Sequence, residues 1–207
     1  MSNPFTAGLP RHSLIPYVPG EVNWEEVPEL SVDRVLWEPD AGIRAFGRFC
    51  FNDEALGVSL RAVEREIRAT YTAPLSPVCR DSCLEFFFMQ ENEDRYFNFE
   101  INPNGCLYIG FGHGREDSTA LYRDGMSSFF KIKTAGTADG WEVSYWIPLS
   151  FLRLFCPGFA FSGRLRANVY KCGDDTVRPH YLSWNPVLSD TPDFHRPEDF
   201  GIMAFRK

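Results

Sequence analysis

Hydrophobic and polar residues alternate along four runs of the chain, and this alternation predicts β-strands. The runs are residues 82–89, 96–101, 141–147 and 165–170. Successive side chains of a strand point to opposite faces, so each run has one apolar face and one mixed face. The apolar faces predict a core made of Leu84, Phe86, Phe88, Phe97, Phe99, Ile101, Val143, Tyr145, Leu165 and Val169. An all-β fold of two packed antiparallel sheets, a jelly-roll-like sandwich, follows from this pattern.

Weaker signals complete the series of elements. Residues 35–37, 43–51 and 128–133 are predicted as short strands, and residues 150–155 as one helical turn. The apolar residues from Leu56 onward fit two spacings. They recur every three or four residues as far as Ile67, which is typical of a helix, and every second residue as far as Ala62, which is typical of a strand. Periodicity alone leaves both open.

The organisation of the chain is predicted to be simple. Residues 1–20 contain four prolines and little periodicity, which indicates an arm that lies on the domain. Residues 21–207 contain no internal repeat, linker or low-complexity tract, so they are predicted to form one domain. A chain of 207 residues with 44% hydrophobic residues is long enough to bury a substantial core.

Charge limits the classes of partner. The formal net charge is -7 and basic residues are not clustered, so neither nucleic acid nor an anionic membrane is expected as a partner. No apolar run is long enough to span a bilayer. The first residues lack the basic segment and apolar run of a secretory signal, which predicts a cytoplasmic protein. A secreted form from which the signal has been removed would show the same sequence. In that compartment the cysteines are expected to be free thiols, and they are Cys50, Cys79, Cys83, Cys106, Cys156 and Cys172.

The mixed faces of the strands carry the candidate binding chemistry. Carboxylates, amides, phenols and a guanidinium share this face, and they are Glu85, Tyr96, Asn98, Glu100, Arg166, Asn168 and Tyr170. Sugars bind through ring faces stacked on aromatic side chains and through hydroxyls paired with such groups. The solvated face of an antiparallel sheet would carry similar polar residues. A binding surface is favoured by the aromatic residues at the same alternate positions of their strands, Tyr96, Trp146 and Tyr170.

A catalytic alternative rests on Glu85 and Glu100, which could act as the carboxylate pair of a glycosidase. The four histidines, His12, His113, His180 and His195, show no spacing typical of a metal site. The glycines of residues 110–114 open no helix, so a phosphate loop is not indicated. Two hypotheses therefore stand: non-catalytic carbohydrate binding, and an intracellular sugar-processing enzyme that uses Glu85 or Glu100. No cofactor is expected for either.

Four segments in series resemble carbohydrate-binding modules of family 9. Residues 78–87 (VCRDSCLEFF) resemble the family's Asp-Ser-x-x-Glu strand, and residues 96–105 (YFNFEINPNG) its next strand and turn. Residues 141–148 (WEVSYWIP) are similar to a later strand, and residues 194–201 (FHRPEDFG) to the closing element. The resemblance implies a two-sheet sandwich that binds small sugars or the ends of glycan chains. It also favours a strand for the ambiguous segment at Leu56.

The resemblance implies, in addition, an aromatic wall supplied by the closing loop. Secreted family members clamp the sugar between two aromatic rings. At the position of one ring this chain has Cys79, and near the other it has Phe194 and His195, with Trp184 close by in sequence. Family members also hold structural calcium. No acidic run of this sequence matches, so no metal is expected.

Overall fold

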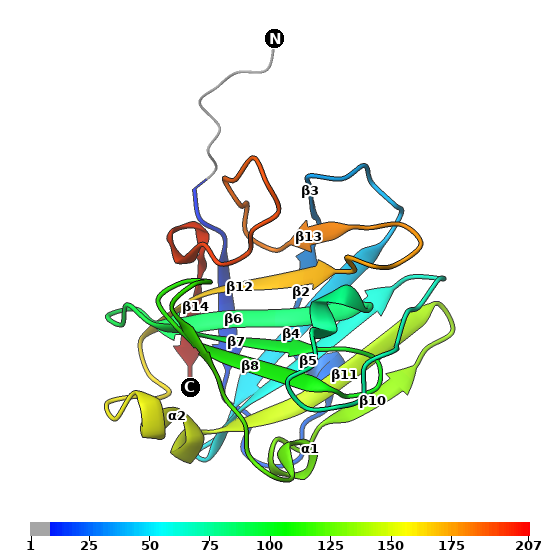
Figure 1. Cartoon of the computed structure of the whole chain (residues 1–207). Helices are drawn as coiled ribbons and strands as arrows, with labels where there is room; N and C mark the ends of the chain where they lie inside the picture. Colours follow the sequence, from blue (N-terminus) through cyan, green and yellow to red (C-terminus); the bar gives the residue numbers. More distant parts are fainter. Residues whose placement is uncertain (1–8) are drawn as a thin grey trace.

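Two β-sheets pack face to face in the computed structural model, which describes residues 9–207 (Figure 1). The predicted all-β sandwich is thus confirmed. The larger sheet has the strand order β1-β14-β12-β6-β7-β8-β9, and β13 and β3 extend it beside β12. Its strands are β1 (His12–Pro16), β3 (Arg34–Leu36), β6 (Cys83–Gln90), β7 (Tyr96–Ile101), β8 (Leu107–Gly112), β9 (Ser118–Ala120), β12 (Arg164–Cys172), β13 (Tyr181–Ser183) and β14 (Gly201–Arg206). All neighbours are antiparallel except β1 and β14.

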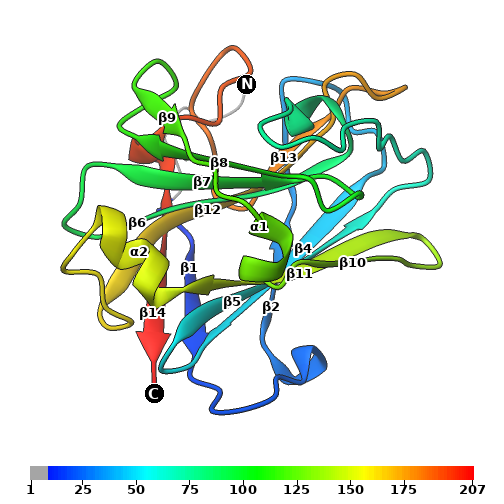
Figure 2. The ribbon, with the colours of Figure 1, turned by 60° about the horizontal axis from the view of Figure 1, so that its bottom comes forward.

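The smaller sheet is antiparallel throughout and has the order β10-β11-β5-β4-β2. Its strands are β2 (Glu29–Val32), β4 (Arg44–Phe51), β5 (Ala55–Val63), β10 (Lys133–Gly136) and β11 (Gly140–Pro148). Two short helices, α1 (Met126–Phe129) and α2 (Leu149–Phe155), lie at one end of the sandwich (Figure 2). Three 3-10 turns complete the described structure, at Trp24–Glu26, Val78–Arg80 and Pro197–Asp199. No helix in residues 9–207 is long and apolar enough to cross a membrane.

The core between the sheets is formed as the alternation predicts. All ten residues predicted for the core are buried there, each at most 1% exposed. The ambiguous segment at Leu56 forms β5, which pairs with β4 on one side and β11 on the other. Its strand spacing prevails because a central strand of this sheet has a ladder of hydrogen bonds on both edges.

One local prediction is wrong, and one segment is more regular than expected. Residues 128–133 do not form a strand. After Gly125, which has a left-handed backbone (φ 69°), the chain makes the helical turn α1, and the strand β10 begins only at Lys133. Residues 12–16, expected within an arm, form β1 and pair in parallel with β14, and this pairing buries Ile15. The backbone hydrogen bonds to β14 stabilise a strand here, although the sequence between Pro10 and Pro16 shows little alternation.

The outer face of the larger sheet is covered rather than solvated. Connections 64–82 and 173–200 fold over it and form a second apolar cluster with the strands. Its buried members are Val78, Cys83, Phe87, Met89, Tyr96, Cys106, Tyr170, Cys172, Val187, Phe194 and Phe200. Truncation of an apolar side chain on this face therefore removes buried surface and should lower stability.

Candidate functional site

The register of the larger sheet brings the candidate residues into one row on the covered face. Glu85 of β6 is directly opposite Glu100 of β7 and Tyr170 of β12. Glu100 is in turn opposite Tyr108 of β8. Residues directly opposite on antiparallel strands have Cβ atoms about 5 Å apart and share a face. The two carboxyl groups are thus neighbours because the turn between β6 and β7 sets this register.

The covering connections leave a cavity of about 410 Å³ above this row. Its floor is formed by Glu85, Phe87 and Glu100, and a ring is contributed from the β8 side by Tyr108. Small-molecule sites in proteins have volumes of about 300–1,000 Å³. The cavity is therefore large enough for a small ligand.

The floor of the cavity carries two buried carboxyl groups. The exposed fraction of Glu85 is 2% and that of Glu100 is 8%. Burial, and then the neighbouring Glu100, raises the pKa of Glu85 well above its usual value. Burial likewise raises the pKa of Glu100 to about 7, against a hydrogen bond from Asn98 that lowers it. Near neutral pH the floor can thus both donate and accept hydrogen bonds.

Asn98 positions Glu100 from the adjacent place on the same face of β7. Its Nδ2 donates to Glu100 Oε1 at 2.7 Å, while its Oδ1 lies against Gly110 of the adjacent strand β8. A Cβ at position 110 would overlap that oxygen, so only glycine allows the close approach. The amide Oδ1 is buried and has no hydrogen-bond partner within the described residues.

One rim of the cavity is charged. Arg115, just before β9, forms an ion pair with Asp193 of the closing connection at 2.9 Å. Asp193 also accepts a hydrogen bond from the backbone N–H of His195. The ring of His195 lies over Phe87, and its Nδ1 is 2.7 Å from the hydroxyl of Tyr96. The ion pair and the Tyr96 contact tie the closing connection to the sheet.

The other rim is aromatic. Trp37, immediately after β3, packs against Phe194 and Tyr181 with ring centroids 5.4 Å apart in both cases. Phe194 stacks in turn on Tyr170 at 4.0 Å. The backbone of Trp37 is left-handed (φ 53°), a conformation that costs a non-glycine residue about 1–2 kcal/mol. Its Nε1 donates to the carbonyl of Ser189, which fixes the indole in this orientation.

The structure divides the candidate residues of the sequence into four groups. Glu85, Glu100, Phe194 and His195 line the cavity. Tyr96, Asn98 and Tyr170 are buried beside the cavity and form hydrogen bonds with His195, Glu100 and Phe194, respectively. The third group, Arg166 and Asn168, bonds the closing connection at the carbonyls of Pro197 and Asn185. The fourth is Trp184, which is buried in the core between the sheets, and this placement corrects its expected role in the aromatic wall.

The sequence interpretation missed several residues of the cavity. The rings are Trp37, Tyr108 and Tyr181, and the charged groups are Arg115, Asp174 and Asp193. Tyr108 could have been predicted from the sequence, because the turn at residues 102–105 places it opposite Glu100. Tyr181 belongs to β13, which is too short to show a period, and the others come from connections without periodicity, so no sequence signal brings them to this face.

His195 provides a pH prediction. Burial, and then Arg115, lowers the pKa of His195 to about 4, below the usual 6.5. The unfolded chain therefore binds the proton more readily, and the stability from neutral His195 is present above pH 6.5 and lost as pH falls towards 4. We expect the stability advantage of wild type over His195→Gln to shrink by about 2 kcal/mol between pH 7 and 4, with allowance for the partly exposed ring.

Urea denaturation at a series of pH values measures this difference. Tyr96→Phe is the control, because it removes the hydroxyl contact and keeps the histidine, so its pH dependence should follow wild type. A wild-type advantage that stays constant from pH 7 to 4 would contradict the prediction.

A family model and similar solved structures both relate the chain to carbohydrate-binding proteins. A model of carbohydrate-binding family 9 matches residues 17–205 of the chain. No curated protein sequence matches significantly. Among solved structures, a candidate carbohydrate-binding protein from Bacteroides uniformis ATCC 8492 is 25% identical, with a TM-score of 0.81 over 96% of this chain and 100% of that one.

Two further structures share the fold at lower identity. They are of a family 9 carbohydrate-binding module from Caldicellulosiruptor kristjanssonii, one in complex with cellotriose and one with glucose. Both are 15% identical to this chain, with a TM-score of 0.64 over 95% of it. The aligned region covers 94% of the chain in the cellotriose complex and 96% of the chain in the glucose complex.

Proposed function

Because the chain belongs to carbohydrate-binding family 9, we propose that it is a non-catalytic domain that holds a small sugar or the end of a glycan chain. The ligand occupies the cavity above Glu85 and Glu100. The observation that carries the proposal is the combination in one cavity of buried carboxyl groups, a guanidinium and an aromatic rim. The family 9 modules from C. kristjanssonii, in complex with glucose and cellotriose, support a ligand of this class.

The cavity offers each kind of contact that a sugar uses. The CH face of a pyranose packs on aromatic rings, which the rim supplies through Trp37 and Phe194. Vicinal hydroxyls pair with carboxyl and guanidinium groups, which Glu85, Glu100 and Arg115 supply. The carboxyl groups of the floor are buried, so each hydrogen bond to them is worth more than on an open sheet face.

A thermal-shift screen of monosaccharides and short glucans tests the proposal. A ligand that binds only the native state raises the melting temperature, by an amount that grows with its concentration relative to Kd. The same samples are analysed for consumption of the ligand. Loss of the sugar during incubation would favour the alternative in which Glu85 and Glu100 catalyse hydrolysis, and an unchanged sugar supports binding alone.

Conservative changes on the cavity floor should weaken the ligand found by the screen. Glu85→Gln and Glu100→Gln keep the shape of the side chain and replace one acceptor oxygen by an amino group. A ligand hydroxyl left without its partner costs about 1–3 kcal/mol, which raises Kd roughly 5- to 150-fold. Calorimetric titration measures the change.

Glu142→Gln is the matched control, because this exposed glutamate of β11 lies on the other sheet. It should bind as wild type does. The proposal for this cavity fails if both floor variants also bind as wild type does, since the sugar then lies elsewhere.

A further inference from the structure

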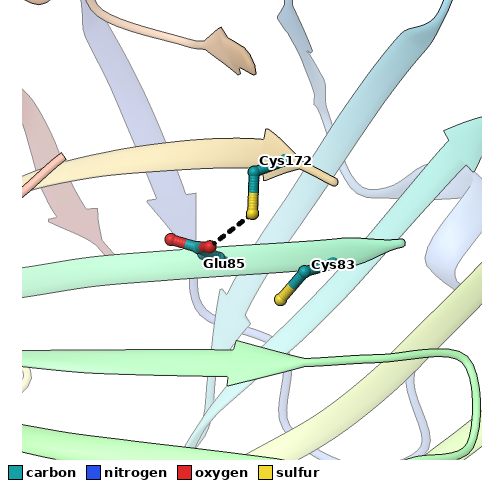
Figure 3. A group of neighbouring side chains, drawn as sticks. All are labelled: Cys83, Glu85 and Cys172. Carbon is teal, nitrogen blue, oxygen red and sulfur yellow. Dashed lines mark hydrogen bonds between the residues drawn. The ribbon is translucent and has the colours of Figure 1, made fainter. Parts of the chain in front are cut away.

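A group of thiol and carboxyl side chains lies where β12 ends and β6 begins (Figure 3). Cys83 and Cys172 are directly opposite each other in the register of these strands. Glu85 follows Cys83 by two residues, so it projects from the same face of β6. All three side chains are buried. The pairing of two strands thus places two sulfurs and one carboxylate together.

The three potential ligand atoms are close enough to bind one ion. The two Sγ atoms and a carboxylate oxygen of Glu85 all lie within 4.8 Å of one another. Cys172 Sγ donates a hydrogen bond to Glu85 Oε1 at 2.9 Å (Figure 3). Glu85 and Cys172 also line the cavity, so an ion can reach the group from solvent.

The basic residues near the group, Arg115 and Lys171, form their ion pairs with other carboxylates. Glu85 faces a second buried carboxyl group, that of Glu100, and neither forms an ion pair within residues 9–207. Arg115, the basic residue of the cavity, is paired with Asp193 at the rim. A buried cluster of acids and thiols is most stable as neutral groups or around a bound cation.

We propose that Cys83, Glu85 and Cys172 form a site for a borderline-soft divalent cation, with Zn²⁺ as its natural occupant. Tetrahedral zinc has Zn–S distances of about 2.3 Å and Zn–O distances of about 2.1 Å, which separate its ligand atoms by roughly 3.6–3.8 Å. The three atoms reach this arrangement with movements of about 1 Å. The fourth position faces the cavity, where water or a ligand oxygen completes the shell.

The donor set selects the class of ion. Two thiolates favour zinc and its soft neighbours, whereas Ca²⁺ and Mg²⁺ require shells of six or more oxygens. Binding releases the two thiol protons and the proton of a protonated Glu85 to solvent, because thiolate and carboxylate are the forms that bind the ion. The site shares Glu85 with the proposed sugar cavity. The thiolate band reports the ion and calorimetry reports the sugar, so either proposal can fail without the other.

Titration of reduced, chelator-treated protein with Co²⁺ tests the site. Co²⁺ bound by thiolates absorbs in the near ultraviolet through sulfur-to-metal charge transfer, so this band reports the ligands directly. We expect saturation at one Co²⁺ per chain, displacement by Zn²⁺, and no displacement by excess Ca²⁺. Zn²⁺ should also raise the melting temperature of wild type, which requires no variant.

Variants identify the ligands. Cys83→Ser and Cys172→Ser should each reduce the charge-transfer band by about half and weaken Zn²⁺ binding at least about tenfold. Glu85→Gln should weaken binding and retain the band. Cys50→Ala is the matched control, since this buried cysteine of β4 lies in the other sheet, and it should bind as wild type does.

Two results would overturn the proposal. One is the absence of both the band and a Zn²⁺-dependent rise in melting temperature for reduced wild type. The other is a band that persists in full in Cys83→Ser and Cys172→Ser but is lost in Cys79→Ser, which would assign the ion to the remaining thiol of the cavity.

Discussion

Replacing Phe99 by alanine should lower the free energy of unfolding by about 3–5 kcal/mol, the usual cost of removing a fully buried aromatic ring. Phe99 of β7 is 0% exposed, and it packs against rings from both sheets, from α2 and from the residue after α1. Its ring stacks on Tyr145 of β11 at 6.0 Å and meets the edges of Phe130 and Phe151 at 5.6 and 6.3 Å. Because these partners come from three separate elements, collapse around the cavity left by the ring would require all three to move.

Urea denaturation measures the loss as a lower midpoint with an unchanged slope. Tyr122→Ala is the matched control, because this aromatic residue is 53% exposed and its removal should change stability by less than about 0.5 kcal/mol. If Phe99→Ala unfolded at the same urea concentration as the control, the assignment of the inner face of β7 would be wrong.

The inner faces of the strands could be predicted from sequence because they depend on a local rule. Side chains alternate with a period of two, so Phe97 and Phe99 must share a face whatever the rest of the chain does. The short turn after β7 likewise fixes the partner strand β8. The ambiguity at Leu56 was settled by resemblance to a family, since local spacing fits both a helix and a strand.

The site could be predicted only in part because it depends on contacts that are distant in sequence. Alternation places Glu85 and Glu100 on the face of the sheet that points away from the core, and these two residues form the floor of the cavity. Its rims come from Trp37, Arg115 and the closing connection, which are ordered by tertiary contacts such as that between Tyr96 and His195, 99 residues apart. Irregular connections carry no period, so neither the covering of this face nor the left-handed backbone of Trp37 could be read from the pattern.

The cross-strand cysteines illustrate the same limit. Metal sites that are visible in sequence have ligands at short spacings within one segment. Cys83 and Cys172 are separated by 89 positions and become neighbours only through the pairing of β6 with β12. A site of this kind requires the strand order, which alternation does not provide.

A buried ion pair at the end of the core provides the second large effect. Lys171 continues the inward-facing series of β12 after Val169, and it is 0% exposed. Its ammonium lies 3.2 Å from Oε1 of Glu64, whose side chain is 1% exposed. Glu64 also accepts hydrogen bonds from Trp141 Nε1 and Ser82 Oγ, so one carboxylate joins residues of both sheets.

His180 completes the network as a neutral base. Its Nε2 lies 2.8 Å from Lys171 Nζ, and its Nδ1 lies 2.8 Å from the carbonyl of Arg178. Burial, and then the charge of Lys171, lowers the pKa of His180 to about 4. The neutral ring can therefore accept a hydrogen bond from the ammonium and donate one to the carbonyl. Every polar atom of this group thus has a partner.

We expect Lys171→Met to lower the free energy of unfolding by about 3–5 kcal/mol, because it leaves the Glu64 carboxylate buried without its cation. The double variant Glu64→Met, Lys171→Met should be more stable than Lys171→Met alone, since it removes the uncompensated charge. The difference between the single and double variants measures the coupling of the pair.

The exposed pair Arg61–Asp139 is the matched control for this experiment. Its atoms are closer, at 2.8 Å, but its side chains are 40% and 47% exposed. Water screens such a pair, so Arg61→Met should cost less than about 1 kcal/mol. Equal losses for Lys171→Met and Arg61→Met in urea denaturation would show that burial does not determine the strength of the Lys171–Glu64 pair. A larger loss for Lys171→Met, partly restored in the double variant, would locate the effect in the desolvated carboxylate.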